Sequence, residues 1–326
     1  MPLRRRLLNL LSDGEFHSGE DLGASLGVSR MAVWKHLKAL RDMGVDFSVQ
    51  RGKGYCLTTS LELLERGRIL SAATDMTAAA IDDIAVFLEV DSTNNWLREQ
   101  TLNGAPSGTV CVAELQLAGR GRRGRTWVSP FAANLYLSLL WRSATGAAAL
   151  GGLSLATGIA VLRALRGYGI KDAGLKWPND ILASDAKLAG VLIDVVGEAS
   201  GPCAVIVGIG VNVCMPRGEA AAIDQSWTDL YHLTGDNCIS RNVLAARILD
   251  ELLPAIDTFD AAGLQPFLDE WRHYDVVRGR EVDLTLPNES ITGTACGIDD
   301  GGALLVDTTH GRRRFVSGDV TLRLAT

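Results

Sequence analysis

The chain has 326 residues, of which 47% are hydrophobic and 21% charged, and its formal net charge is −6. This length suggests two or three domains, and the composition excludes a disordered or fibrous chain. The first 60 residues contain nine basic and six acidic side chains, so they carry +3 while the remaining 266 carry −9. A basic head on an acidic body indicates a nucleic-acid-binding domain joined to a domain of another kind.

Cysteine, histidine and hydropathy patterns exclude several further classes. The six cysteines form no CxxC pair, which favours reduced thiols in a cytoplasmic protein over disulfides or a zinc site. The five histidines show no metal-ligand spacing, so no residue is assigned to a metal. Ser12, Asp13 and Gly14 interrupt the apolar run near the start, which favours a first amphipathic helix over a signal peptide. No apolar stretch reaches the ~20 residues of a membrane span, so no membrane partner is expected.

The first 60 residues have the pattern of a helix-turn-helix. Leucine spacing predicts a helix over 4–11, and a second helix over 20–26 ends at Gly27. Ser29 can cap a third helix over 30–43, in which Val33, Leu37 and Leu40 form one buried stripe. Such a helix enters the DNA major groove in helix-turn-helix proteins.

A β-hairpin is predicted to follow this helix, with strands over 45–50 and 55–57 and a basic, glycine-rich tip. The tip suits a wing that contacts phosphates. A small helical packing module with solvated lysines is the alternative. The predicted DNA contacts are Ser29, Arg30, Lys35, His36, Lys38, Arg51 and Lys53.

The middle of the chain alternates strand and helix patterns. We predict a helical connector over 61–73, strands over 85–90, 109–117 and 134–141, and an internal helix over 150–167. A helical segment over 241–271 is expected to be interrupted at Pro254 and Pro266. The last 55 residues hold five short alternating runs, which predict a small barrel. Its three adjacent arginines at 312–314 fit a solvated edge strand better than a contact patch.

An arginine- and glycine-rich loop follows the predicted strand over 109–117. Arg120, Arg122, Arg123 and Arg125 alternate with glycines, which let backbone N–H groups approach an anion while guanidinium groups pair with carboxylate or phosphate. The loop lacks the Lys-Ser/Thr of a nucleotide-binding P-loop. A solvated basic loop that binds nucleic acid is the alternative.

Three other segments carry polar groups at strand ends. The hydroxyl and amide residues at 92–95 either cap a helix or hold the polar part of a ligand. Pro178 places Lys176, Asn179 and Asp180 on a strand–turn–strand corner. A lysine, Lys187, begins the strand over 187–194. The two glycines at 208 and 210, in the strand run over 204–213, are expected where a ligand lies against a strand, and 214–226 reads as a mobile loop.

Five motifs in this chain resemble those of bacterial biotin–protein ligases. They are DSTNNWL at 91–97, GRGRRGRTW at 119–127, KWPND at 176–180, KLAGVLID at 187–194 and GIGVN at 208–212. The predicted winged head makes the chain similar to the bifunctional members, which also repress the biotin operon. The resemblance implies an α+β multidomain fold. Its expected parts are a winged helix-turn-helix head (1–62), a mixed α/β ligase core like the class II synthetases (63–271) and an SH3-like β-barrel tail (272–326).

The resemblance implies a two-step reaction. Biotin and ATP, with Mg²⁺, form biotinyl-5′-AMP, and the biotinyl group then passes to a lysine of a biotin carboxyl carrier protein of acetyl-CoA carboxylase. It also implies binding to operator DNA and a homodimer that forms when the adenylate binds. The segment 191–196 is a candidate dimer edge.

The resemblance also implies roles for matched residues. The expected biotin-binding residues are Ser92, Thr93, Asn94, Gln116, Gly119, Arg120, Gly121, Arg122 and Lys187, of which Arg120, Arg122 and Lys187 are expected to be catalytic. The expected ATP and adenylate contacts are Arg125, Trp127, Lys176, Asn179, Asp180, Asn212 and Trp227. Two alternatives remain: a transcription factor that only senses its ligand, and an acyl ligase that uses lipoate or a fatty acid.

Overall fold

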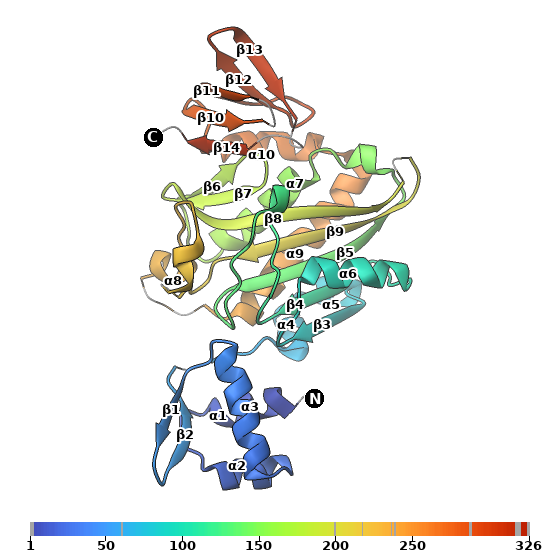
Figure 1. The fold of residues 1–326 in the computed structure, drawn as a ribbon. Helices are drawn as coiled ribbons and strands as arrows, with labels where there is room; N and C mark the ends of the chain where they lie inside the picture. The colour runs from blue at the N-terminus through green and yellow to red at the C-terminus, as the bar shows by residue number, and fades with distance from the viewer. Residues whose placement is uncertain are drawn as a thin grey trace.

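The computed structural model describes residues 3–59, 61–198, 200–216, 218–235, 237, 239–286, 289–316 and 321–324, with only the backbone at 220, 321, 323 and 324. Figure 1 shows an N-terminal head, a central body built on a large sheet, and a small C-terminal sheet at the opposite end from the head. The sequence-based expectation of an α+β multidomain chain is confirmed.

The head has the predicted helix-turn-helix and wing. Ser18 and Ser29 cap the second and third helices, because their hydroxyls accept the N–H groups of Asp21 (3.1 Å) and Ala32 (3.2 Å). Gly27 ends the second helix in the left-handed conformation (φ 71°), which glycine adopts readily. The elements are α1 (Leu3–Leu11), α2 (Gly19–Leu26), α3 (Arg30–Asp42), β1 (Phe47–Gln50) and β2 (Gly54–Leu57).

The segment after the head is only partly helical, contrary to the helix predicted over 61–73. Helix α4 (Arg66–Ala72) begins late, because the preceding backbone bonds to side chains of the body instead of to itself. Leu64 N donates to Glu114 Oε1 (2.6 Å) and Glu65 N donates to Asn242 Oδ1 (2.8 Å). These tertiary bonds satisfy the backbone groups that a helix would otherwise pair. A short helix, α5 (Asp75–Ala80), leads into the central sheet.

The body is built on a seven-stranded sheet in the described part of the chain, with strand order β3-β4-β5-β9-β8-β7-β6. β3 and β4 are parallel and the other neighbours are antiparallel. The strands are β3 (Asp83–Phe87), β4 (Thr109–Ala113), β5 (Leu135–Ser143), β6 (Ala173–Lys176), β7 (Asp180–Ala183), β8 (Ala186–Gly197) and β9 (Cys203–Val211).

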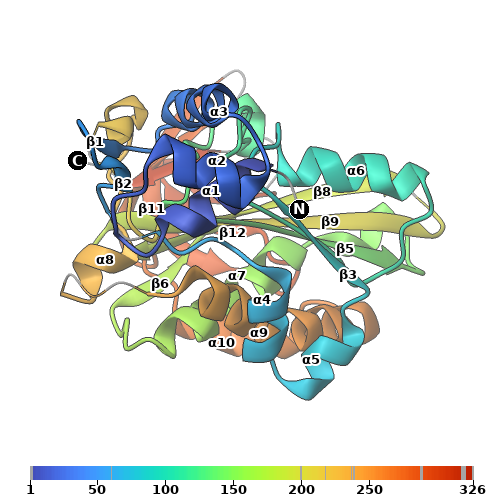
Figure 2. The same cartoon turned by 90° about the horizontal axis from the view of Figure 1, so that it is seen from below.

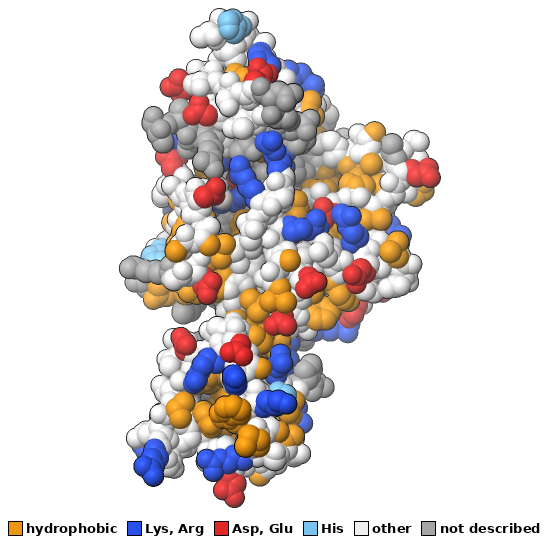
Figure 3. All heavy atoms as spheres, viewed as in Figure 1, with side chains coloured by type: hydrophobic (Ala, Val, Ile, Leu, Met, Phe, Trp, Pro, Cys, Tyr) orange, Lys and Arg blue, Asp and Glu red, His pale blue; other side chains and the backbone are white. Residues whose placement is uncertain are grey.

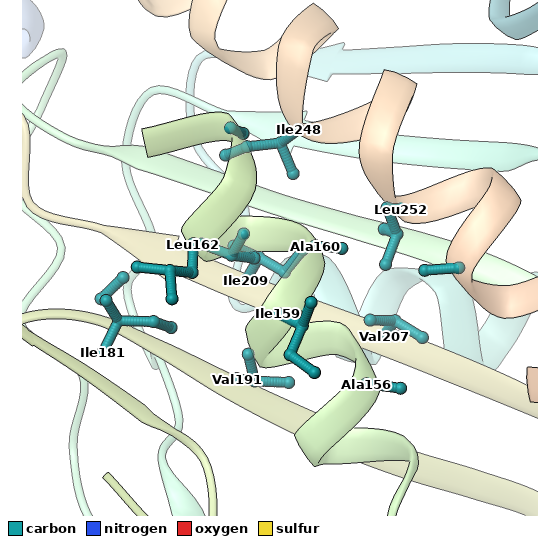
Figure 4. Close-up of a cluster of buried hydrophobic side chains, with 14 of the residues drawn as sticks. Ala156, Ile159, Ala160, Leu162, Ile181, Val191, Val207, Ile209, Ile248 and Leu252 are labelled. Carbon is teal, nitrogen blue, oxygen red and sulfur yellow. The ribbon is translucent and has the colours of Figure 1, made fainter. Parts of the chain in front are cut away.

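Helices cover both faces of this sheet (Figure 2). Helix α6 (Thr93–Leu102) lies on one face, and α7 (Leu153–Arg166) and α9 (Arg241–Ala262) lie on the other. Ile159 and Leu162 of α7 and Leu252 of α9 belong to the main hydrophobic core, and Leu162 points toward Ile181 (Figure 4). This burial is the main stabilising term of the body. Smaller helices are α8 (Leu230–Leu233) and α10 (Leu268–His273).

One predicted helix break is wrong. Pro254 lies inside α9, which runs unbroken from Arg241 to Ala262. Proline removes one helical hydrogen bond, but the buried neighbours Leu252, Leu253 and Ala255 hold this stretch against the core. Pro266 does lie outside α9, at the start of a short 3₁₀ turn (Gln265–Phe267).

The C-terminal region is a five-stranded antiparallel sheet with strand order β13-β12-β11-β10-β14. Within the described residues the hydrogen-bond ladder does not join β13 to β14, so the predicted barrel is an open sheet there. On the edge strand β13 each arginine is ion-paired, as when Arg312 meets Asp307 at 2.7 Å. These pairs support the solvated-edge interpretation. The strands are β10 (Glu281–Thr285), β11 (Ser290–Ile298), β12 (Leu304–Thr308), β13 (Gly311–Phe315) and β14 (Thr321–Leu324).

In the part of the chain that the structure describes, no helix has both the length and the apolar character needed to span a bilayer. The five cysteines described are free thiols. The sixth, Cys238, lies outside the described residues.

Candidate functional site

A cavity of about 420 Å³ opens between the start of α6, the arginine loop, the β6–β7 corner and the middle of the sheet. Segments far apart in the sequence therefore share one site. Of the residues expected to bind biotin or nucleotide, all except Gly119 line this cavity. Gly119 lies beside it, where a Cβ would come within 2.6 Å of Ser129 Oγ. The predicted site is thus spatially coherent, although the roles of its residues stay predictions.

One part of the cavity holds a largely buried network of hydroxyl and amide groups. Gln116 Oε1 accepts hydrogen bonds from the backbone N (2.9 Å) and hydroxyl (3.1 Å) of Thr93. Ser138 donates to Asn94 Oδ1 at 2.6 Å and lies 2.7 Å from Thr93 Oγ1. Ser92 is the N-cap residue of α6 without a side-chain capping bond. A ligand with a small polar ring meets fixed donors and acceptors here.

The arginine loop forms a small hairpin over the cavity. Gly121 N donates to Arg125 O (2.7 Å) and Trp127 N donates to Gly119 O (2.9 Å). The turn between them has positive φ at Arg123 (56°) and Gly124 (71°). A non-glycine residue in this region is uncommon and marks a loop held by its contacts.

Those contacts attach the hairpin to three different parts of the chain. Arg120 meets Asp194 of β8 at 2.7 Å. Arg122 donates to Asn179 Oδ1 at 3.4 Å, at the β6–β7 corner. Arg123 donates to the carbonyl of Thr285 (3.1 Å) in the C-terminal sheet, whose Leu322 also lines the cavity. The loop therefore closes the site by bonds to the body and to the tail.

The opposite end of the cavity is cationic. Lys187 Nζ lies 2.8 Å from Asp180 Oδ1 and 5.2 Å from the centre of the Trp127 ring. Lys176 Nζ approaches the other oxygen of Asp180 at 3.7 Å. Burial lowers the pKa of Lys176, and Asp180 partly opposes that effect. Burial also lowers the pKa of Arg122, although arginine stays charged at neutral pH.

Two glycines of β9 are explained by side chains that form the site. A Cβ at Gly208 would come within 2.3 Å of Asn94 Oδ1, and one at Gly210 within 2.5 Å of the Trp127 ring. The sequence interpretation placed a ligand against these glycines. In the structure both glycines line the cavity, and they also leave room for the side chains of Asn94 and Trp127.

Several site residues were not predicted from sequence. Ser138 and Asp194 contact predicted residues but lie inside apolar strands, where a lone polar residue was the available signal. Trp177, whose bond to Pro178 is cis, also lines the cavity. The segment 222–225 lies on the cavity wall. It belongs to the loop predicted over 214–226, which contains a short 3₁₀ turn at Glu219–Ala222.

The candidate DNA-binding face lies on α3 and the wing. Lys35 and Lys38 are exposed, His36 is half-buried, and Arg30, Arg51 and Lys53 are exposed. Ser29 is used as the helix cap. The same face has two large exposed apolar side chains, Met31 (71% exposed) and Trp34 (50%), which the sequence interpretation did not single out. Figure 3 shows hydrophobic and basic side chains close together on the head.

Family models match three successive parts of the chain. Residues 86–212 match the biotin/lipoate A/B protein ligase family, residues 3–56 match an HTH domain, and residues 278–323 match the biotin protein ligase C-terminal domain. These matches place the chain among ligases with an appended helix-turn-helix head.

Similar proteins show to which kind of ligase the chain belongs. The chain is 42% identical over 320 residues to the bifunctional ligase/repressor BirA of Escherichia coli, covering 98% of this chain and 97% of that protein. It is 31% identical to BirA of Bacillus subtilis, covering 98% of both. The biotin protein ligase from Aquifex aeolicus, solved with biotin and ATP, is 30% identical with a TM-score of 0.64, covering 75% of this chain and 100% of that one. This chain belongs to the biotin/lipoate A/B protein ligase family, as a member with the domain set of the bifunctional ligase/repressors.

Proposed function

We propose that this chain joins biotin to ATP and transfers the biotinyl group to a lysine of a biotin carboxyl carrier protein, and that its head represses biotin-synthesis genes. The observation that carries the ligase activity is one cavity with a buried polar network at one end and a cationic cluster at the other. A ligand with a polar ring and a carboxylate tail fits this polarity, and the cationic end fits the phosphates of a nucleotide.

The first step joins two anions, and the site supplies charge to offset their repulsion. A biotin carboxylate oxygen attacks the α-phosphorus of ATP, and the bond from that phosphorus to pyrophosphate breaks. Within the described residues, cations on the cavity wall include Lys176, Lys187, Arg120 and Arg122. Preorganised charge of this kind stabilises the transition state without rearranging at the moment of reaction. No side-chain nucleophile is needed.

Biotin is proposed to lie with its ring against Ser92, Thr93, Asn94 and Gln116 and its carboxylate toward Lys187. The buried network fixes the donors and acceptors of Thr93 and Gln116 before the ligand arrives. Gly119 and Gly121 allow the loop backbone to fold over the ligand, and Arg120 and Arg122 close it. A closed loop excludes water, which protects the mixed anhydride from hydrolysis.

ATP is proposed to occupy the cationic end, with Lys176, Arg125, Asn179 and Asn212 near its phosphates and Trp127 and Trp227 beside the base or ribose. Mg²⁺ enters with ATP as part of the substrate. The carboxylate of Asp180 lies on the cavity wall, and one carboxylate combined with substrate phosphates is a usual set of Mg²⁺ ligands. The residues present therefore fit the metal, which would offset phosphate charge.

In the second step the ε-amine of a carrier lysine attacks the carbonyl of the mixed anhydride, an amide forms and AMP leaves. Lys187 and the arginine loop would stabilise the negative charge that develops on the carbonyl oxygen and on AMP.

The head is proposed to bind operator DNA through Ser29, Arg30, Lys35, His36, Lys38, Arg51 and Lys53. Its helix-turn-helix geometry and exposed basic side chains support this proposal. A homodimer formed on adenylate binding, through the edge of β8 near 191–196, is proposed to tighten operator binding. The proposed domains are residues 1–62, 63–271 and 272–326, and the proposed location is the cytoplasm.

Intact-mass spectrometry tests the ligase directly. The purified chain is mixed with biotin, MgATP and a carrier domain, and the carrier should gain one biotinyl group. A parallel reaction with lipoate tests the related acyl ligase, and it should give no product. Intact biotin binding without transfer would favour a regulator that only senses its ligand.

A further inference from the structure

Asp194 of β8 is a charged residue of the site that the proposed chemistry does not use. Its side chain is 13% exposed and lies on the part of β8 beyond the pairing with β7. Two site groups meet its Oδ2 atom: Arg120 NH2 at 2.7 Å and Asn94 Nδ2 at 3.1 Å. A partly buried carboxylate with two donors on one oxygen is firmly held.

The contact with Asn94 sets the direction of that amide. A carboxylate only accepts hydrogen bonds, so the NH₂ of Asn94 must face Asp194 and its oxygen must face Ser138, which donates at 2.6 Å. Gly208 leaves the space in which the amide sits. The orientation of Asn94 is therefore fixed from two sides, and Asp194 is one of them.

The contact with Arg120 links Asp194 to the arginine loop. Arg120 lies at the base of the loop hairpin, where it bridges to Thr126. Asp194 thus bonds at the same time to the closing loop and to a residue of the cavity floor. Opening of the loop would remove one donor from Asp194 and loosen its hold on Asn94.

We propose that Asp194 is a positioning residue that couples closure of the arginine loop to the orientation of Asn94, and so controls how long the reaction intermediate is retained. This inference rests on the proposed ligase function. Asp194 touches neither reacting atoms nor nucleotide in this role. Its loss should affect retention of the acyl-adenylate and the KM for biotin more than kcat at saturating biotin, because Asp194 bonds to Asn94, Arg98 and Arg120 and not to Lys187 or Arg122, the other two residues expected to be catalytic.

The test compares full-length variants by the lifetime of bound biotinyl-5′-AMP, formed from biotin and MgATP without carrier protein. Asp194→Ala should shorten that lifetime and raise the KM for biotin by roughly 10-fold each, as expected for a lost charge-assisted hydrogen bond with a half-exposed partner. The kcat should change by less than about 3-fold. Asp194→Glu keeps the charge, so its adenylate lifetime should be longer than that of Asp194→Ala. Asp194→Asn keeps the shape without the charge, so its lifetime should lie between those of Asp194→Ala and Asp194→Glu.

A matched control is available in Arg98→Ala. Arg98 approaches the other oxygen of Asp194 at 3.6 Å but belongs to α6 and not to the loop, so its loss should leave the lifetime unchanged. In a double-mutant cycle, Asp194→Ala and Arg120→Ala should be strongly non-additive. Additive effects, or a lifetime in Asp194→Ala and Asp194→Asn equal to that of Arg98→Ala, would overturn the inference. If the wild-type chain forms no adenylate, the proposed function itself fails instead.

Discussion

Lys187 and Lys176 share one carboxylate, that of Asp180, at distances of 2.8 Å and 3.7 Å. Two ammonium groups so close together repel each other unless an anion lies between them. Asp180 neutralises part of this charge. The remaining positive charge belongs to two lysines that line the cavity. The arrangement holds cations ready for an anionic substrate at the place where charge is expected to develop.

Replacing Lys187 should reduce activity without unfolding the protein. Lys187→Ala removes a charge from the cavity wall, not from the hydrophobic core, and the rate of adenylate formation should fall roughly 10²–10³-fold. Arg122→Gly should mainly weaken adenylate retention. Pyrophosphate release in single-turnover experiments measures the rate. Lys171→Ala, at an exposed lysine outside the cavity, is the control and should behave as wild type. A collapsed melting curve for Lys187→Ala would show that the lysine is structural.

A buried ion pair fixes the segment between head and body. Arg241 NH1 lies 2.7 Å from Glu114 Oε2, and both side chains are at most 5% exposed. Glu114 also accepts the N–H of Leu64. Glu114→Gln leaves a buried guanidinium without its counter-charge, so the free energy of unfolding should fall by about 3 kcal/mol. Urea unfolding followed by circular dichroism measures this value.

The matched control for the ion pair is Glu251→Gln. Glu251 meets Arg163 at 3.8 Å, and both side chains are 41% exposed. A change of less than about 1 kcal/mol is expected for such a pair. Equal losses of unfolding free energy in the two variants would mean that the buried Glu114–Arg241 pair stabilises the protein no more than an exposed pair does.

Most of the site was predictable from sequence because its residues cluster in short motifs at strand ends. Thr93, Arg122, Asn179 and Lys187 lie in such motifs, and the fold brings them to one cavity. Asp194 was missed in this role because its partners are 74 and 100 residues away. No local pattern encodes such contacts.

The errors in the fold predicted from sequence also come from contacts between distant residues. The segment 61–65 is extended because Glu114 and Asn242 bond to its backbone, and α9 continues through Pro254 because the core holds it. Tertiary contacts override local propensity in both cases. The head was predicted well, since its caps and its leucine stripe act within a few residues.

Asp275 should make stability depend on pH. Burial raises its pKa from 3.8 to about 6, and hydrogen bonds from Val277 and Arg278 only partly offset this. At pH 3 and below the carboxyl is protonated in most folded and unfolded chains, so it adds almost no penalty. As the pH rises from 3 through 6, the unfolded chain ionises first and the folded chain loses stability, by about 3 kcal/mol in total.

The variant Asp275→Asn isolates this contribution. Asparagine does not ionise, so the stability of the variant relative to wild type should increase by about 3 kcal/mol between pH 3 and pH 7. Urea unfolding of both chains across this range gives the difference, from which the other titrating groups cancel. A difference that stays constant with pH would mean that Asp275 ionises equally in both states.

Operator binding should depend on salt through the basic face of the head. Lys35 is exposed on α3, so Lys35→Ala should remove one phosphate contact. The slope of log Kd against log salt should then decrease by about 1. Fluorescence anisotropy with a duplex selected for binding to the wild-type chain measures the slope. Lys171→Ala again serves as control, and an unchanged slope for Lys35→Ala would remove this residue from the proposed interface.

The edge of β8 should carry the proposed dimer contact. β7 pairs with β8 from Ala186 only as far as Gly190, whereas β9 pairs with β8 as far as Gly197. The outer half of β8 therefore has one side without a strand neighbour among the described residues, and a second chain could extend the sheet there. With biotin and MgATP present, sedimentation velocity should show concentration-dependent dimers and operator binding should tighten.

The variant Val196→Lys tests this edge. Two copies paired across β8 would bring like charges close together, so the dimer Kd should rise by at least about 10-fold, as expected for charges opposed across a strand pair and a polar group placed in an apolar contact. Adenylate formation should persist, because Val196 does not line the cavity. Val316→Lys, at an apolar residue 64% exposed directly after β13, is the matched control and should dimerise as wild type. Normal dimers in Val196→Lys, with weakened dimers in the control, would move the interface from β8 to the C-terminal sheet.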